Sequence, residues 1–573
     1  MTFPVKYKYS NLSTWIVAVT ACLICCFYTW QHPGSVNFLG GDARYYYIYL
    51  QNTFINSALI NYDWLDPANG IVITHHPAGL GILWLPFFLV ALLFASVFNF
   101  PPDGVSLPFQ AAVSIAALVY CVTGLVYLKK LLQLNQISDK VTALIIALIF
   151  FGTNLFHYTI NESGMSHVYS FCLLTVFLYH GCKLVQTGNN KNLLYAALTF
   201  GLIVLVRPNN GLIIFSLFFW FRSKEQCLTF FRGLVQKKYF YYAVLSAFLV
   251  IAVQPLTWLW KEDTLFVNRY ATYGFYWLNP HLFEMLFGFE AGFFIYTPLC
   301  FIFLFGLIAM YSENKFLFFS VTTFILLLFY IFASYSAYTY YDGLGIRVLI
   351  DYYSLFALLG AKLFMQLGQY KLLFNAVGTV SLFMVVINLI YCYQGENNIL
   401  ARAGMNYHKW KYIFLKTGKK YEGSLGGSND LPPFSKHQPL VALNDEVKFD
   451  QPFDFSNKEY GPALFFDSIG FNSKRVQLKL KIRRRESSAN SSKDVLVCAM
   501  LEGKTDTAHR GYLQFRLNET PSVDCCSDRE YEYSANMEAQ FKSSDHLTVY
   551  LWNLKKQAFS IDKFSVQVYN YNY

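Results

Sequence analysis

Residues 79–98, GLGILWLPFFLVALLFASVF, decide the topology of this chain. The run is apolar throughout and long enough to cross a bilayer, because a spanning helix needs about 20 such residues. Whether it crosses determines the side of the membrane on which every later loop lies. Trp84 and Pro86 suit a broken helix or one that lies along the outer interface.

The chain as a whole is also poor in charge. Of its 573 residues, 55% are hydrophobic and 14% are charged, whereas a soluble domain carries about 25% charged residues. This composition excludes a soluble enzyme, a disordered protein and a nucleic-acid-binding protein. Eleven further runs are predicted to span the membrane: 14–31, 108–128, 141–160, 168–186, 192–207, 210–222, 239–260, 292–311, 316–335, 353–368 and 372–393.

Basic residues predict the orientation, because loops on the cytoplasmic side are enriched in Lys and Arg. Lys6 and Lys8 precede the first span, which is interpreted as an uncleaved signal anchor. If 79–98 does not cross, the cytoplasmic loops hold Lys129, Lys130, Lys140, Lys183, Lys191, Arg222, Lys224, Arg232, Lys237, Lys238, Lys315 and Lys371. If it crosses alone, the rule is violated throughout. We therefore expect a cytoplasmic N-terminus, and a C-terminal part in the periplasm of a bacterium with an inner membrane.

The character of the sequence changes after residue 393. We expect a membrane domain over 1–393, a linker over 394–439 and a separate domain over 440–573. The last of these alternates apolar and polar residues over 476–482, 495–501, 512–517, 547–551 and 564–569. This period predicts a β-sandwich of jelly-roll type outside the membrane. A disulfide among Cys498, Cys525 and Cys526 stays open.

Charged residues near a membrane are costly and tend to be functional. Here they gather in the predicted outer loops. Asp42 follows Gly40-Gly41, with Arg44 close behind, and the tyrosines 45–47 continue the segment. The other candidates are His75, His76, Glu162, His167, Arg207, Arg269, Asp342 and Arg347.

Structural alternatives exist for each of these residues. For Asp42 the alternative is a turn residue at a helix start, and for Glu162 and His167 it is a helix N-cap region. Arg207 suits snorkelling to lipid headgroups. His75 and His76 are typical of polar residues at the interface. For Arg347 the alternative is an ion pair with Asp342 or Asp351.

The order of these parts resembles the GT-C class of integral-membrane glycosyltransferases, in the branch of the protein O-mannosyltransferases and lipid A aminoarabinose transferases. Gly41-Asp42-Ala43-Arg44 is similar to the acidic element that follows the first span in that branch. His76-Pro77, followed by 79–98, is similar to the element that leads into a helix along the membrane. The family often has a second acid next to the first, where this chain has Ala43. Glu162 or Asp63 could supply it.

The resemblance implies a polyprenyl-phosphate sugar donor, an acceptor hydroxyl on a protein, lipid or glycan, and no metal or other cofactor. Asp42 is the expected base for the acceptor hydroxyl, with Glu162 as the other catalytic candidate. Guanidinium groups suit the leaving phosphate. The expected substrate-binding residues are Arg44, His75, His76, His167, Arg207, Arg269, Asp342 and Arg347.

Two other functions compete with this one. A transporter or flippase of a lipid-linked glycan would place its charges near the membrane midplane on repeated, broken helices. Here the charges lie at the outer ends of the spans and no repeat is visible. A membrane-anchored glycan-binding protein would not need eleven spans. The sequence therefore favours the enzyme, and leaves the sugar and the acceptor open.

Overall fold

The computed structural model describes residues 7–31, 42–55, 76–262, 264–266, 274–340, 343–401, 405–422, 425, 441–488, 491–492, 494–504, 509–519 and 529–570. The chain divides into two compact units. The first contains 1–340 and 344–392, and the second contains 341–343 and 393–573.

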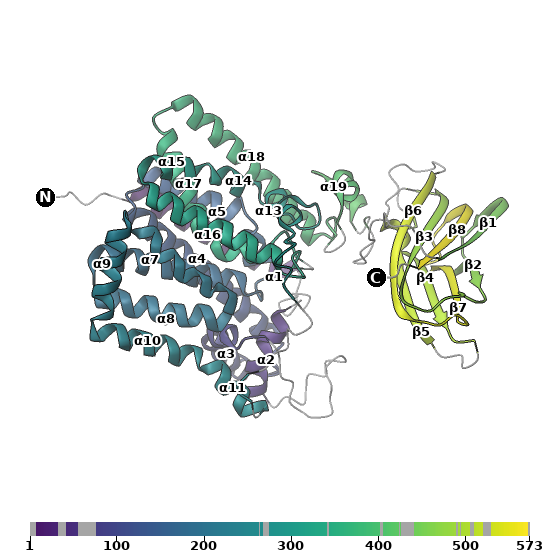
Figure 1. Ribbon diagram of the computed structural model, residues 1–573, viewed down its shortest axis with the longest axis horizontal. Helices are drawn as coiled ribbons and strands as arrows, with labels where there is room; N and C mark the ends of the chain where they lie inside the picture. The colour runs from purple at the N-terminus through teal and green to yellow at the C-terminus, as the bar shows by residue number, and fades with distance from the viewer. Residues whose placement is uncertain are drawn as a thin grey trace. The chain divides into compact units, whose positions relative to one another are not determined.

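The first unit is helical (Figure 1). Its helices are α1 (Lys8–Gln31), α2 (Ala43–Phe54), α3 (Gly79–Val97), α4 (Leu107–Leu134), α5 (Asp139–Phe151), α6 (Leu155–Ile160), α7 (His167–Thr187), α8 (Asn190–Val206), η3 (Pro208–Trp220), α9 (Lys224–Val235), α10 (Lys238–Ile251), α11 (Val253–Glu262), α12 (Leu282–Phe287), α13 (Phe293–Tyr296), α14 (Pro298–Leu304), α15 (Gly306–Glu313), α16 (Lys315–Ser334), η4 (Arg347–Tyr352), α17 (Tyr353–Leu367) and α18 (Lys371–Glu396). Among the described residues, eight helical stretches are long and apolar enough to cross a membrane, and two apolar helices are shorter.

These helices confirm the predicted class, a polytopic helical membrane protein. Each predicted span coincides with helix, but several are not single α-helices. The span 141–160 is divided between α5 and α6, and 210–222 largely coincides with the 3-10 helix η3. The span 292–311 contains three short helices. One of its breaks lies at Pro298, which begins α14 because proline cannot donate the backbone hydrogen bond that would continue α13.

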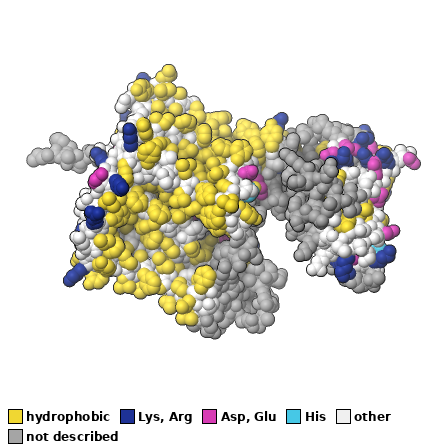
Figure 2. Space-filling model, viewed as in Figure 1, with side chains coloured by type: hydrophobic (Ala, Val, Ile, Leu, Met, Phe, Trp, Pro, Cys, Tyr) yellow, Lys and Arg dark blue, Asp and Glu magenta, His cyan; other side chains and the backbone are white. Residues whose placement is uncertain are grey.

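The surface of the helical unit is that of a lipid-facing protein. Apolar side chains cover the face shown in Figure 2, and the visible Lys and Arg side chains gather at the end where α9 lies. On α18, Leu382 is 63% exposed and Phe383 is 53% exposed. Exposed apolar patches of this extent mark contact with lipid or with another protein.

The two ends of α3 lie near α8 and α4. At its start, a Cβ on Gly79 would lie 2.5 Å from the backbone oxygen of Leu205, at the end of α8. At its end, the short segment 98–106 connects α3 to the start of α4. By length and composition α3 is one of the helices that could cross a membrane, so its non-crossing position stays a prediction.

The second unit contains a β-sandwich. Its strands are β1 (Val441–Asp454), β2 (Tyr460–Phe466), β3 (Ser473–Glu486), β4 (Val495–Glu502), β5 (His509–Arg516), β6 (Arg529–Phe541), β7 (His546–Asn553) and β8 (Phe559–Asn570). They form two four-stranded sheets, ordered β1-β8-β3-β6 and β2-β7-β4-β5. This is the strand order of a jelly roll, so the predicted fold of this part is confirmed.

Alternation along the strands builds the core of the sandwich. Leu478, Leu480 and Ile482 of β3 point inward and are fully buried, and they belong to one cluster with Val497 of β4 and Val549 of β7. The five predicted strands are found as β3, β4, β5, β7 and β8, while β1, β2 and β6 are additional. Before the sandwich, the segment after α18 contains the short helix α19 (Tyr407–Ile413) and the 3-10 turn η5 (Lys419–Tyr421).

Candidate active site

Asp42 lies at the N-cap position of α2, but its side chain makes no capping hydrogen bond. Instead, its Oδ2 accepts a hydrogen bond from the Arg347 guanidinium at 3.0 Å, and its Oδ1 lies 3.8 Å from Nε2 of His76. The Asp42 side chain is 32% exposed, whereas the Arg347 side chain is 13% exposed. The carboxylate of Asp42 therefore interacts with the side chains of Arg347 and His76, and not with the N-terminus of α2.

Aromatic rings of α2 hold His76 in place. The ring of Tyr45 stacks on the imidazole at a centroid distance of 4.7 Å, and Tyr46 meets it edge-on at 5.0 Å. The hydroxyl of Tyr49 donates to the backbone oxygen of His76 at 2.8 Å. The His76-Pro77 segment and the start of α2 thus form one local structure that presents Nε2 to Asp42.

A short irregular segment positions Arg347. Asn154, between α5 and α6, donates to the backbone oxygen of Leu344 at 2.6 Å and accepts from the hydroxyl of Tyr353. These contacts fix both ends of the segment that carries η4. Gly345 has a φ of +68°, and a Cβ there would lie 3.0 Å from Cβ of Tyr296. A left-handed backbone in so narrow a space requires glycine.

A second carboxylate, that of Asp351, is fully buried in a neighbouring cluster. Its Oδ1 lies 3.0 Å from Nδ1 of His167, and its Oδ2 accepts from the Asn210 amide at 2.7 Å. Nε of Arg207 lies 3.3 Å from the same Oδ2. Asn210 also accepts a hydrogen bond from the Tyr352 hydroxyl at 3.2 Å. Because a buried charge is costly unless it is paired and hydrogen-bonded, this network fixes Arg207 in place.

The two carboxylates belong to one site. Arg207 donates to the hydroxyl of Ser166 at 3.0 Å. Ser166 in turn interacts with the Tyr46 hydroxyl, on the helix that follows Asp42. Arg207 also acts electrostatically on Asp42. Segments from α2, the His76 turn, the α7 start, the α8–η3 junction and η4 therefore meet at one place.

The charges of the site keep Asp42 ionised. Burial alone would raise the pKa of Asp42. The positive charge of Arg347, followed by the interaction with His76, outweighs burial and holds that pKa below its usual range. Burial raises the pKa of Tyr46, and the charge of Asp42 adds to this effect, so its phenol stays protonated.

The structure brings together five of the predicted site residues: Asp42, His76, His167, Arg207 and Arg347. Glu162 lies 3.6 Å from Nε2 of His157 and within electrostatic range of Arg347. Arg44 is half-buried on α2, beside the site. The predicted residues His75, Arg269 and Asp342 lie outside the described residues.

From the sequence, Asp351 is one of two possible ion-pair partners of Arg347. In the structure it pairs with Arg207 instead, while Asp42 pairs with Arg347. The reason is the 3-10 geometry of η4, which contains both residues. Side chains four positions apart face the same way on an α-helix, but in a 3-10 helix they diverge by about 120°.

Sequence reasoning also misses several members of the site. Asn210 and Ser166 lie in candidate loops but have no predicted role, and Asp351 is expected only as a partner of Arg347. Asp351 could have been found from the sequence. It lies inside the apolar run that follows Arg347, where a carboxylate is costly unless it is paired. For Ser166 and Asn210 no such signal exists, since both residue types are common in loops.

The arrangement can serve an acid–base reaction on an anionic substrate. It offers an ionised carboxylate, two guanidinium groups and a histidine on one side of an apolar helical bundle. Within the described ranges, no group of three or more His, Cys, Asp or Glu side chains has the geometry to hold a metal ion.

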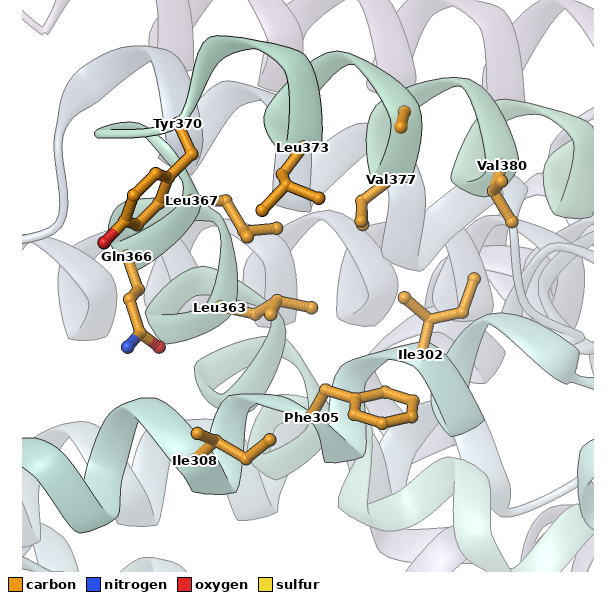
Figure 3. Close-up of a pocket in the computed structure, with 11 residues that line it drawn as sticks. Ile302, Phe305, Ile308, Leu363, Gln366, Leu367, Tyr370, Leu373, Val377 and Val380 are labelled. Atoms are coloured by element: carbon orange, nitrogen blue, oxygen red, sulfur yellow. The ribbon is translucent and has the colours of Figure 1, made fainter.

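An apolar pocket of about 550 Å³ lies elsewhere in the helical unit, between α14, α15, α17 and α18 (Figure 3). Its lining is almost wholly aliphatic and aromatic, with Gln366 and Tyr370 at one end. None of the charged residues of the site lines it. It resembles a surface for lipid chains more than a reaction site.

Fold and site together define a polytopic membrane protein with a charged, partly buried cluster on one side of its helical bundle. No family model and no curated protein matches the chain. Among solved structures it is similar to the arabinosyltransferase EmbB from Mycobacterium smegmatis, with 10% sequence identity and a TM-score of 0.30. The match covers 83% of this chain and 59% of that chain, so this chain spans less than two thirds of that protein's length. A likeness at this level assigns no activity, and the function has to be derived from the site.

Proposed function

We propose that the protein is a membrane glycosyltransferase that moves a sugar from a polyprenyl-phosphate donor to an acceptor hydroxyl on the outer face of a bacterial inner membrane. The observation that carries this proposal is the pairing of Asp42 with Arg347 at 3.0 Å beside Arg207. A carboxylate and two guanidinium groups at one site match the two ends of the reaction. One end needs a proton acceptor and the other needs an anion-binding group.

The step requires a specific division of roles. The acceptor oxygen attacks the anomeric carbon of the sugar, and its proton passes to the carboxylate of Asp42. The bond between that carbon and the phosphate oxygen breaks, and its electron pair stays with the phosphate. Arg347 and Arg207 bind the phosphate oxygens through charge-assisted hydrogen bonds. Arginine suits this task because its five N–H groups can serve Asp42 and a phosphate together.

A lipid-linked donor is supported by the position of the site. The site lies among the ends of apolar helices whose outer surfaces are built for lipid, so a polyprenyl chain could remain in the bilayer while its phosphate reaches the arginines. The GT-C resemblance adds a second argument, because its two motif segments, at Asp42 and at His76, come within 3.8 Å of each other. Acceptor proteins, lipids and glycans all present the required hydroxyl.

The decisive experiment compares two Asp→Asn variants for transfer from a radiolabelled polyprenyl-phosphate sugar in nanodiscs. Asp42→Asn removes the base, and loss of a positioned base typically costs on the order of a hundredfold to ten-thousandfold in rate. We expect transfer to fall by that amount while donor binding is retained. Asp103→Asn is the matched control. The Asp103 carboxylate accepts from the backbone N–H groups of Val105 and Ser106, which an asparagine oxygen can also do.

Near-normal transfer by Asp42→Asn would contradict the assignment of the base. Glu162, which lies within electrostatic range of Arg347, would then be the first residue to test. Absence of transfer from every polyprenyl-phosphate sugar by the unaltered protein would contradict the proposed function itself.

A further inference from the structure

The two outer faces of the β-sandwich differ in chemistry. The sheet β1-β8-β3-β6 presents alternating charges to solvent. Lys481 pairs with Glu532 at 2.8 Å, and Arg483 lies 3.9 Å from Glu530. Such a face is ordinary for a solvated antiparallel sheet, in which inward apolar residues alternate with outward polar ones.

The sheet β2-β7-β4-β5 presents an aromatic face instead. We define this face by Tyr460, Phe465, Tyr512, Tyr550 and Trp552. On β7 the inward residues Val549 and Leu551 are fully buried, so their neighbours Tyr550 and Trp552 point outward. Of the other members, Tyr460 is 57% exposed, Phe465 is 65% exposed and Tyr512 is 50% exposed.

Strand register aligns the rings of this face. Tyr460 of β2 pairs directly with Trp552 of β7, and their rings are parallel to within 6° at a centroid distance of 6.1 Å. Tyr550 continues the row along β7, 6.4 Å from the ring of Tyr460. Polar groups lie between and beside these rings. The indole N–H of Trp552 faces Glu459 at 3.3 Å, and the hydroxyl of Tyr512 donates to Gln514 at 3.1 Å.

This combination of aromatic rings and polar groups differs from the lipid-facing surface of the same protein. On α18 the exposed residues include Leu372, Val380, Leu382 and Phe383, which carry no polar atoms in their side chains. The aromatic face instead combines ring faces with hydroxyl, amide and carboxylate groups. Beside it, the cations Arg516 and Lys555 are both paired with Asp494, at 3.3 and 3.0 Å.

We propose that the aromatic face binds an uncharged oligosaccharide. Sugar rings present C–H groups on one side and hydroxyls around the edge. The C–H groups carry partial positive charge and stack on the negative face of an aromatic ring, while the hydroxyls bond to polar groups beside it. Parallel rings bordered by Glu459 and Gln514 offer both kinds of contact. The inference rests on the proposed function in one respect, since it makes the bound glycan a substrate or product of the transferase.

The test uses the full-length protein in nanodiscs and a panel of immobilised neutral oligosaccharides of hexoses and pentoses. We expect the unaltered protein to bind at least one of them, and the double variant Tyr460→Ala/Trp552→Ala to bind it at least tenfold more weakly. Tyr569→Ala is the matched control. Tyr569 lies on the outer face of the other sheet, where its hydroxyl donates to Gln567 much as Tyr512 does to Gln514.

Each other outcome would overturn the inference. Absence of binding across the panel, or equal loss in Tyr569→Ala, means that the face is not a glycan site. A double variant that loses only attachment to sugar-free liposomes makes the face a membrane contact, and one that loses only self-association makes it an interface between copies. Asp42→Asn separates this proposal from the function. It should abolish transfer and keep glycan binding, so either property can fail without the other.

Discussion

Asp42 and Arg347 are 305 positions apart in sequence and 3.0 Å apart in space. The pair explains why Asp42 is ionised although it is partly buried, because the guanidinium offsets the cost of burial. In the proposed reaction this pairing has a second consequence. A donor phosphate that draws Arg347 toward itself weakens the hold on Asp42 and makes the carboxylate a stronger base.

The pair predicts a specific pH dependence. Asp42 must be unprotonated to act, and its lowered pKa places the acidic limb of kcat/KM below the usual range of a carboxyl group. Arg347→Gln removes the largest influence that lowers the pKa of Asp42, so that pKa rises and the acidic limb of the rate should move to higher pH. The measurement is a pH profile of transfer for the unaltered protein, for Arg347→Gln and for Arg347→Lys, which keeps the charge. An identical acidic limb in Arg347→Gln would show that Arg347 does not control Asp42.

The lowered pKa of Asp42 also affects how the stability of the protein depends on pH. Asp42 contributes stability that is fully present above the pKa of the unfolded chain and is lost as the pH falls through the folded pKa. The contribution of this pair is therefore complete at neutral pH.

Asp351 is predicted to act through Arg207. In Asp351→Asn the Arg207 guanidinium loses its buried counter-charge, which typically costs about 3 kcal/mol or more when one partner of a buried pair is removed. We expect a lower denaturation temperature and a raised KM for the donor. The double variant Asp351→Asn/Arg207→Gln should regain part of the lost stability without regaining donor affinity. If the double variant is as unstable as the sum of the two single changes, the residues do not act as a pair.

Much of this site is within reach of sequence reasoning, but its pairings are not. Asp42, His76, Arg207 and Arg347 stand out in the sequence because charges near a membrane are costly. Which carboxylate meets which arginine depends on how distant segments pack. Asp42 reaches Arg347 only because Asn154 and Gly345 fix the segment that leads into η4. No sequence pattern around Asp42 or Arg347 predicts that contact.

At the scale of elements, the long helices follow directly from apolar runs, whereas their breaks do not. The run 292–311 is continuous in hydrophobicity, yet it is interrupted at Pro298. The 3-10 form of η3 and η4 is likewise invisible in composition, because 3-10 and α-helices use the same residue types. The irregular segments are the ones that carry Asn210, Arg347 and Asp351, so the part of the fold that is hardest to predict positions the site.

The contact of α3 with α8 gives a prediction at this scale. Gly79→Ala would place a Cβ 2.5 Å from the backbone oxygen of Leu205, so α3 or α8 must shift. The shift would reach His76 on one side and Arg207 on the other, and we expect transfer to fall at least tenfold. Gly378→Ala on α18 is the control, because no atom lies within 4 Å of the added Cβ. Thermal denaturation of both variants separates a local shift from a general loss of fold. Full activity in Gly79→Ala would mean that this contact does not position the site.

At the scale of the whole molecule, the C-terminal jelly roll is predictable because its core strands alternate strictly. In β3 the residues Leu478, Leu480 and Ile482 alternate with polar ones and are fully buried. The strand β6 also alternates, but its inward residues include Tyr533, Ala535 and Met537, which a hydrophobicity pattern weights less. In β6 the alternation of hydrophobicity is therefore a weaker signal than in β3.

The orientation of the molecule is the last prediction. It rests on the distribution of basic residues. Lys and Arg gather in the loops predicted to be cytoplasmic, and if α3 does not cross, the parity of the remaining spans puts the segment after α18 outside the cytoplasm. A reporter active only in the cytoplasm should therefore be silent when fused after Tyr573 and active when inserted at Gly188, in the turn between α7 and α8. The opposite pattern would invert the molecule and place Asp42 and Arg347 in the cytoplasm. Activity at both positions would mean that an even number of spans separates them, so that one of the predicted spans between Gly188 and the sandwich does not cross.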